Sequence, residues 1–354
     1  MRDMPLSVRA DLATLPDYVP GRKIPGAIVL SSNEVATPPP ESVVAAITAA
    51  ATEVNRYPQM ANDDVLARTA AYLGVPDDQV AIGAGSVALG QQFVQAMCAE
   101  GQEVMFAWRS FEAYPIITQI AGARGVKVPL TADYRHDLDA MAAAITGDTR
   151  LVFIANPNNP TGTTLHAAEL TRFLDNVPDH VLVVLDEAYR EFITDSTVPD
   201  GLELAAGRPN VAVTRTFSKA YGLAGLRVGY SVAPPEVTAA ARKVGIPFAV
   251  SRVAQAAAVA AMDAADELLA RCRPVAAERE RVHAALVDMG YEVPPSQANF
   301  VWLPLGDKTA AFNEHCLGQK VVVRAFVGEG ARVTVSGLTE ENDAFLAAAR
   351  SFAG

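Results

Sequence analysis

Short apolar stretches alternate with segments of helical periodicity through most of the chain. Seven runs, most of them rich in β-branched residues, predict β-strands, and they are Gln79–Ile82, Glu103–Ala107, Val126–Leu130, Leu151–Ala155, Val181–Leu185, Val211–Thr216 and Leu226–Val232. Several of these runs are apolar at every position, which is typical of strands covered on both faces. Between two of them, Leu138, Met141, Ala142 and Ile145 recur with the spacing of one helix face. This rhythm predicts an α/β fold with a mostly parallel sheet.

The pattern changes after about residue 245. Val282, Ala285, Leu286 and Met289 mark another helical face, and Gly290 stands where a helix C-cap is expected. Three short strands are predicted beyond it, at Asn299–Leu303, Val321–Ala325 and Arg332–Val335. Short strands next to a long helix indicate a smaller α+β unit.

The first 26 residues are expected to form an extended arm, because Pro16, Pro20 and Pro25 disfavour a helix there. We therefore predict an N-terminal arm over residues 1–26, a large domain over residues 27–245 and a small C-terminal domain over residues 246–354.

Composition narrows the class of protein. Half of the 354 residues are apolar and 19% are charged, which is the balance of a globular chain. The 29 basic and 40 acidic residues give a formal net charge of −11, which disfavours binding to a nucleic acid backbone. Three scattered cysteines and five unpaired histidines predict neither disulfides nor a metal site. With no signal peptide and no apolar run long enough to cross a membrane, we expect a cytoplasmic protein with no membrane partner.

Small residues follow the first predicted strand, from Gly83 to Ala88. They match a loose dinucleotide-binding pattern, but such a site needs an acid at the end of the next strand, whereas Glu103 begins that strand. A nicotinamide site is therefore disfavoured. A helix N-terminus that holds a phosphate through backbone N–H groups stays open.

Polar residues follow three further predicted strands. Asn159 lies in the segment after Leu151–Ala155, Asp186 follows the next strand directly, and Lys219 comes three residues after Thr216. Because the carboxyl ends of parallel strands form the ligand-binding edge of such sheets, we expect these side chains at one crevice. The structural alternatives are an ordinary turn for the Asn159 segment, a helix cap for Asp186 and a solvated surface lysine for Lys219. A partly desolvated lysine is a candidate nucleophile for Schiff-base chemistry.

Three motifs in this order resemble the fold-type I pyridoxal-phosphate aminotransferases of class I/II. They are NPNNPTG at residues 156–162, DEAY at 186–189 and SKAYGLAGLR at 218–227. LPDYVPG at 15–21, NRYP at 55–58 and RVTV at 332–335 resemble the histidinol-phosphate aminotransferase-like subfamily. GSVALGQQ at 85–92, WRSFEAYP at 108–115 and SQANFVWLPLG at 296–306 resemble its bacterial aromatic (phenylalanine) aminotransferase branch. The resemblance implies a large domain with a mostly parallel seven-stranded sheet and a smaller α+β C-terminal domain.

The same resemblance implies catalytic roles and a cofactor, pyridoxal 5'-phosphate. Lys219 would carry the cofactor covalently and move the proton, and Asp186 would pair with the pyridine nitrogen. Asn159 and Tyr189 would bind the ring hydroxyl, and Phe111 would stack on the ring.

The remaining roles concern the phosphate and the substrate. The phosphate would be held by Gly85, Ser86, Val87, Ser218 and Arg227, together with Tyr57 from the second subunit of a homodimer. The substrate would be bound by Arg332 at its α-carboxylate, by Asn33 nearby, and by Tyr18 and Arg324 along its side chain.

The implied reaction moves the amino group of phenylalanine, tyrosine or tryptophan to 2-oxoglutarate by a ping-pong mechanism. In the phosphate loop, Val87 and Ala88 replace the acids that histidinol-phosphate enzymes usually carry, which favours an apolar substrate side chain. Transamination of histidinol phosphate is the principal alternative. Two further alternatives are a pyridoxal-phosphate lyase and a non-catalytic binding module. Arg332 disfavours the lyase, and the joint presence of Lys219, Asp186 and Asn159 disfavours the binding module.

Overall fold

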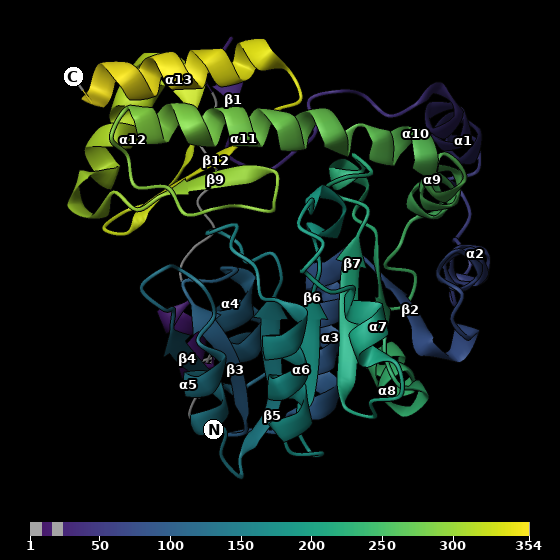
Figure 1. Cartoon of the computed structure of the whole chain (residues 1–354). Helices are drawn as coiled ribbons and strands as arrows, with labels where there is room; N and C mark the ends of the chain where they lie inside the picture. The colour runs from purple at the N-terminus through teal and green to yellow at the C-terminus, as the bar shows by residue number, and fades with distance from the viewer. Residues whose placement is uncertain (1–8, 16–23, 354) are drawn as a thin grey trace, which may run out of the picture.

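A seven-stranded sheet forms the centre of the computed structural model, which describes residues 9–15 and 24–353 (Figure 1). Its strand order is β2-β8-β7-β6-β5-β3-β4, and only β8 runs antiparallel to its neighbours. The strands are β2 (Val80–Gly83), β3 (Glu103–Trp108), β4 (Arg124–Pro129), β5 (Thr149–Ala155), β6 (Leu182–Asp186), β7 (Val211–Thr216) and β8 (Gly229–Val232). Each of the seven strands overlaps one predicted run, and the mostly parallel sheet is confirmed. The strand expected from Leu226 begins only at Gly229, because Ala224–Leu226 form a 3-10 turn.

Helices cover both faces of this sheet. One face packs against α3 (Ser86–Met97), α4 (Ala113–Ile120) and α8 (Pro235–Val244), and the other against α5 (Leu138–Ala143), α6 (Ala167–Asn176) and α7 (Gly201–Ala205). Successive strand residues point to opposite faces, so Phe153 joins the first core cluster and Val152 and Ile154 join the second. Two covered faces explain why the strands carry uninterrupted apolar runs.

A second, smaller sheet lies in the lobe at the upper left of Figure 1. Its strands β9 (Phe300–Leu303), β11 (Arg324–Phe326) and β12 (Gly330–Thr334) are antiparallel, and helices α11 (Cys272–Asp288), α12 (Thr309–Gly318) and α13 (Thr339–Ala353) lie beside them. The single strand expected at Val321–Ala325 is wrong. The chain changes partner there, since β10 (Val321–Val322) pairs with β1 (Ile28–Val29) and the following residues pair with β12.

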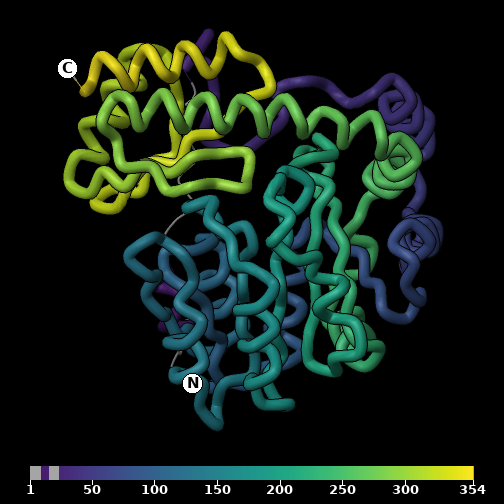
Figure 2. Tube along the Cα trace, viewed as in Figure 1, coloured from purple at the N-terminus to yellow at the C-terminus, as the bar shows by residue number. Residues whose placement is uncertain are grey.

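The N-terminal part of the chain returns to this C-terminal lobe. Figure 2 shows the purple segment containing β1 beside the yellow end of the chain, in agreement with the β1–β10 pairing. Part of the extended arm expected before residue 26 is also corrected, because Ala10–Thr14 form a 3-10 helix ahead of Pro16. The domain division at residues 26 and 245 stays a prediction.

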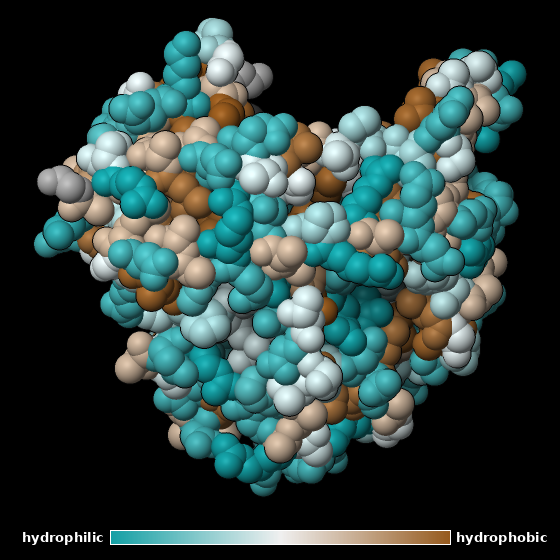
Figure 3. Space-filling view, turned by 45° about the horizontal axis from the view of Figure 1, so that its top comes forward, coloured by the Kyte–Doolittle hydropathy of each residue, from teal (hydrophilic) through white to brown (hydrophobic). Residues whose placement is uncertain are grey.

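Four further helices pack together at the upper right of Figure 1, and they are α1 (Glu41–Ala51), α2 (Asp63–Leu73), α9 (Arg252–Asp263) and α10 (Ala265–Ala270). Single 3-10 turns occur at Asp77–Gln79, Arg190–Phe192, Ala224–Leu226 and Gly306–Lys308. The face drawn in Figure 3 is mostly hydrophilic, with separate hydrophobic patches.

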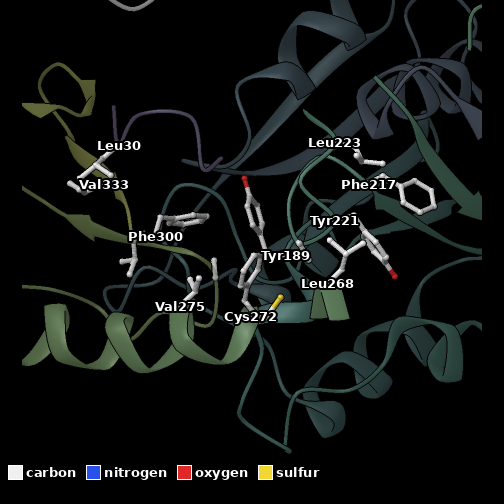
Figure 4. Packing of buried hydrophobic residues seen from close by; sticks show 14 of the residues in the cluster. Leu30, Tyr189, Phe217, Tyr221, Leu223, Leu268, Cys272, Val275, Phe300 and Val333 are labelled. Carbon is white, nitrogen blue, oxygen red and sulfur yellow. The ribbon is translucent and has the colours of Figure 1, made fainter. Parts of the chain in front are cut away.

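One apolar cluster joins the lobe to the large sheet. Figure 4 shows Tyr189 between Phe300 of the small sheet and Phe217, which follows β7. The ring centroids of Tyr189 and Phe300 are 5.0 Å apart in an edge-to-face arrangement. This continuous core fixes β12, which carries Arg332, against the carboxyl ends of β6 and β7.

Candidate active site

A cavity of about 330 Å³ lies where β5, β6 and β7 end, and the small sheet closes it from the other side. It gathers most of the residues that the sequence singled out. The predicted site residues that line it are Asn33, Ser86, Val87, Phe111, Asn159, Asp186, Tyr189, Ser218, Lys219, Arg227 and Arg332. The expectation of one crevice at the strand ends is thus met by the geometry.

Lys219 reaches the cavity from the segment after β7. Its Nζ atom donates a hydrogen bond to the carbonyl oxygen of Ser32, at 2.9 Å. The pKa of Lys219 is lowered to about 8, mainly by burial and also by the positive charges of Arg332 and Arg227, which outweigh the opposite effect of Glu34. About one tenth of the amine is therefore neutral, and hence nucleophilic, at pH 7, far more than for a lysine of ordinary pKa.

This lowered pKa predicts how Lys219 reacts. The neutral amine is the reactive form, so its reaction rate with pyridoxal phosphate should rise with pH through a midpoint near 8 in place of the ordinary 10.5. Stopped-flow absorbance of the cofactor-free protein measures this profile. Because Arg332 contributes to the shift, Arg332→Gln should move the midpoint upward. A midpoint near 10.5 in the unaltered protein would contradict the assignment.

Asp186 closes β6, between Ala155 of β5 and Thr214 of β7. Its Oδ2 atom accepts a hydrogen bond from the hydroxyl of Tyr114, at 2.8 Å. Its Oδ1 atom is buried and has no hydrogen-bond partner among the described residues. Burial raises the pKa of the carboxyl group. An unpaired buried acceptor calls for a donor from a ligand, and a protonated ring nitrogen fits that position.

Tyr114 is a residue of the site that sequence reasoning missed. Its ring stacks on Phe153 with centroids 4.5 Å apart and lies edge-to-face with Phe111. The side chain is buried and lines the cavity. The sequence signal that could have identified Tyr114 is its place in the segment WRSFEAYP, where the resemblance implies a role for Phe111 alone.

Arg332 is buried without a carboxylate partner among the described residues. Its Nη1 atom donates to Oδ1 of Asn159 and its Nη2 atom donates to the carbonyl oxygen of Ser31, both at 2.6 Å. Its Nε atom is buried and unpaired. Burial lowers the pKa of the guanidinium. A desolvated guanidinium held only by neutral acceptors is suited to a carboxylate ligand.

Asn33 and Tyr189 form a second polar pair at the cavity. Asn33 Nδ2 donates to the Tyr189 hydroxyl at 2.9 Å, and the Asn33 backbone N–H donates to Thr334 Oγ1 at the same distance. These bonds connect the β1 segment to β12 and leave the Tyr189 hydroxyl hydrogen free to donate to a ligand.

The opposite end of the cavity has the form of an anion cradle. Helix α3 begins at Ser86, so its unpaired N–H groups face this end. Arg227 Nη1 donates to Ser218 Oγ at 3.2 Å. Gly85 has a φ of +87°, and a Cβ atom there would lie 2.5 Å from Arg227 Nη2. The cradle therefore depends on glycine at position 85.

Replacing Gly85 by alanine should displace Arg227 and weaken cofactor binding, in addition to a backbone strain on the order of 1 kcal/mol. Gly74→Ala is the matched control, because Gly74 also has a positive φ, +69°, but open space around it. Both variants should lose thermal stability from strain, and Gly85→Ala should lose more, because Gly85 has φ +87° and ψ 164° whereas Gly74 has a left-handed helical conformation. Only Gly85→Ala should bind pyridoxal phosphate more weakly in equilibrium titrations. Equal cofactor affinity in the two variants would show that the cradle is wrongly placed.

Among the predicted residues that the structure describes, Gly85, Tyr57 and Arg324 do not line the cavity, although Gly85 directly precedes Ser86, which does. Arg324 pairs with Glu112 at 2.8 Å. Tyr57 is 78% exposed, and its ring lies 4.7 Å from that of Phe248. Tyr18 lies outside the described residues. The proposed roles of Arg324, Tyr57 and Tyr18, like those of the residues that line the cavity, stay predictions.

Glu103 has a structural role. It is buried at the start of β3, accepts hydrogen bonds from Thr146 and Thr149 at 2.8 Å each, and pairs with Arg124. It lies far from the strand ends that form the cavity, so the structure gives no support to a nicotinamide site. Among residues 9–15 and 24–353, no group of three acidic, histidine or cysteine side chains could hold a metal ion, and no helix could cross a membrane.

The donor set fits pyridoxal phosphate. The cradle matches a phosphate, Asp186 offers its unpaired oxygen to a ring nitrogen, and Lys219 offers a partly neutral amine to an aldehyde. Arg332 lies across the cavity and is free for a substrate carboxylate.

Comparisons with known proteins agree with this geometry. Residues 25–349 match the family described as aminotransferase class I and II. An aromatic amino acid aminotransferase of Rhodococcus jostii is 58% identical, over 97% of this chain and 95% of its own length. An aromatic amino acid aminotransferase of Streptomyces coelicolor is 56% identical, over 98% of this chain and 97% of its own length. A structure of histidinol-phosphate aminotransferase from Sinorhizobium meliloti with pyridoxal-5'-phosphate has a TM-score of 0.89 at 31% identity, covering 98% of this chain and 97% of that one. The chain belongs to the class I and II aminotransferases.

Proposed function

We propose that this chain binds pyridoxal phosphate at Lys219 and transfers the amino group of an aromatic amino acid to 2-oxoglutarate. The observation that carries the proposal is the convergence of Lys219, Asp186 and Arg332 on one cavity. The relatives that are more than half identical over nearly the whole chain, named aromatic amino acid aminotransferases, support the choice of substrate.

Each residue of the cavity has a distinct task. Bound pyridoxal phosphate supplies an electrophilic carbon and a ring that accepts electrons from the substrate α-carbon. Arg332 binds the substrate carboxylate, Lys219 Nζ takes and returns the α-proton, and Asp186 holds a proton at the ring nitrogen facing it. Phe111 lines the cavity, where it would stack on the cofactor ring.

The cavity wall favours an apolar substrate side chain. Val87 and Phe111 line it, and Val87 stands where an acid is usual in the histidinol-phosphate enzymes. Histidinol phosphate remains the second candidate substrate, because Arg324 is a cation close to Arg332 and the Sinorhizobium meliloti structure bears that enzyme's name.

Formation of glutamate from 2-oxoglutarate, with phenylalanine as amino donor, tests the proposal. We expect turnover with phenylalanine, tyrosine or tryptophan. No turnover with any of the three, in the cofactor-loaded protein, would contradict the proposed substrate class. A cytoplasmic location stays a prediction.

A homodimer is the proposed assembly. Several large apolar side chains in two segments that approach each other are exposed in the single chain, and they are Val54, Tyr57, Met60, Ile246 and Phe248. Burial of such a patch by a second copy would remove its contact with water. This supports the implied placement of Tyr57 at the cofactor phosphate of the partner's site.

Replacing Tyr57 by phenylalanine should weaken cofactor binding by roughly 1.5–3 kcal/mol, since one hydrogen bond to a charged group is lost. Equilibrium titration of the cofactor measures the change, and Tyr134→Phe, at a tyrosine that does not line the cavity, is the control. Sedimentation at assay concentration checks the assembly. A fully active monomer would contradict both the dimer and the role of Tyr57.

A further inference from the structure

Two ion pairs join the loop at residues 108–112 to the hairpin formed by β11 and β12. Arg324 Nη2 lies 2.8 Å from Glu112 Oε2. In the reverse direction, Arg109 of the loop binds Glu329 of the hairpin turn through two nitrogens, one of them, Nε, at 2.6 Å. Each side thus contributes one acid and one arginine.

The first of these pairs lies beside the substrate end of the cavity. Arg324 and Arg332 are directly opposite each other on the antiparallel strands β11 and β12, so their side chains share one face. Glu112 directly follows Phe111, which lines the cavity. A substrate whose carboxylate is held by Arg332 would therefore have Arg324 and Glu112 as its neighbouring charges.

The two ion pairs differ in what surrounds them. Both side chains of the Glu112–Arg324 pair are more than one third exposed, with relative areas of 41% and 36%. Glu329 is similarly exposed, at 39%, and Phe326 lies near both arginines, so the difference is in the arginines: Arg109 is only 16% exposed, binds its acid through two nitrogens and lies over the ring of Trp108. Exposed ion pairs are weak, so a competing carboxylate can replace Glu112 more easily than it can replace Glu329.

We propose that Glu112 determines which co-substrates the cavity accepts, by occupying Arg324 until an acidic side chain replaces it. With Glu112 in place, an aromatic ring meets a neutral pair instead of a bare guanidinium. When a dicarboxylate enters, its distal carboxylate takes the place of Glu112 on Arg324. This inference rests on the proposed function, because it explains how one site serves an apolar donor and an acidic acceptor in turn.

Binding of unreactive analogues to the cofactor-loaded enzyme tests the proposal without turnover. Glutarate represents the acidic co-substrate and 3-phenylpropanoate the aromatic one, and calorimetry gives both dissociation constants. Glu112→Gln should tighten glutarate binding about two- to fivefold and leave 3-phenylpropanoate unchanged or weaker. Glu329→Gln, the matched control in the second ion pair, should change both ligands by the same factor. Glu112→Ala repeats the test if the glutamine variant has a lowered melting temperature.

A double variant isolates Arg324. In Glu112→Gln/Arg324→Met, the gain in glutarate affinity should disappear. Equal tightening of both ligands by Glu112→Gln, or a gain that persists without Arg324, would show a general field effect and overturn the proposal. The proposed function is tested separately, and it fails if the unaltered enzyme does not transaminate aromatic amino acids. If the unaltered enzyme is active but Glu112→Gln leaves the ratio of the glutarate and 3-phenylpropanoate dissociation constants unchanged, only the role of Glu112 is overturned.

Discussion

Lys219→Ala is expected to lower the transamination rate by at least about a thousandfold, because one amine provides both the cofactor attachment and the proton transfer. No other lysine lines the cavity within the part of the chain that the structure describes. The rate is measured with phenylalanine and 2-oxoglutarate after reconstitution with pyridoxal phosphate.

Lys308→Ala is the matched control, since Lys308 is an exposed lysine of the 3-10 turn Gly306–Lys308 and does not line the cavity. It should retain full activity. Circular dichroism of both variants shows whether the fold is kept. A folded Lys219→Ala variant with near-normal activity would remove Lys219 from the mechanism.

Arg332→Gln is expected to have the second largest effect. Truncation of a buried, hydrogen-bonded charge partner costs about 2–5 kcal/mol, which corresponds to a loss in kcat/KM of roughly 30-fold to several thousandfold. The amino donor and the 2-oxo acid both carry the carboxylate that Arg332 would bind, so both half-reactions should be impaired. Separate measurement of each half-reaction, by single-turnover absorbance, distinguishes this from the loss of one substrate alone.

Arg350→Gln is the control, because Arg350 is exposed on α13. It should behave like the unaltered enzyme. If Arg332→Gln impaired only the aromatic half-reaction, Arg332 would belong to the side-chain pocket and the α-carboxylate would be bound elsewhere.

Much of the large sheet could be predicted because its signals are local. The strands β2, β3, β5, β6, β7 and β8 are almost entirely buried, and only the edge strand β4 is largely exposed, so seven runs in the sequence correspond to seven strands in the sheet. The strand ends then place Asn159, Asp186 and Lys219 together, since parallel neighbours present their carboxyl ends at one edge.

The parts of the fold and of the site that could not be predicted depend on contacts between residues far apart in the sequence. Pairing of β1 with β10 joins Ile28 to Val321, and no local pattern specifies a partner so far along the chain. The same pairing divides the strand expected at Val321–Ala325, because alternate partners are available on either side of Val323. The bond from Tyr114 to Asp186 and the pairing of Glu112 with Arg324 likewise link residues whose proximity only the fold creates.

The ratio of kcat/KM for phenylalanine to that for histidinol phosphate, with 2-oxoglutarate as the common acceptor, distinguishes the two candidate amino donors. The apolar wall formed by Val87 and Phe111 predicts that phenylalanine, or one of the other aromatic amino acids, is the better donor. A kcat/KM for histidinol phosphate that exceeds all three aromatic values by about tenfold, or 1.4 kcal/mol, would contradict the proposed substrate.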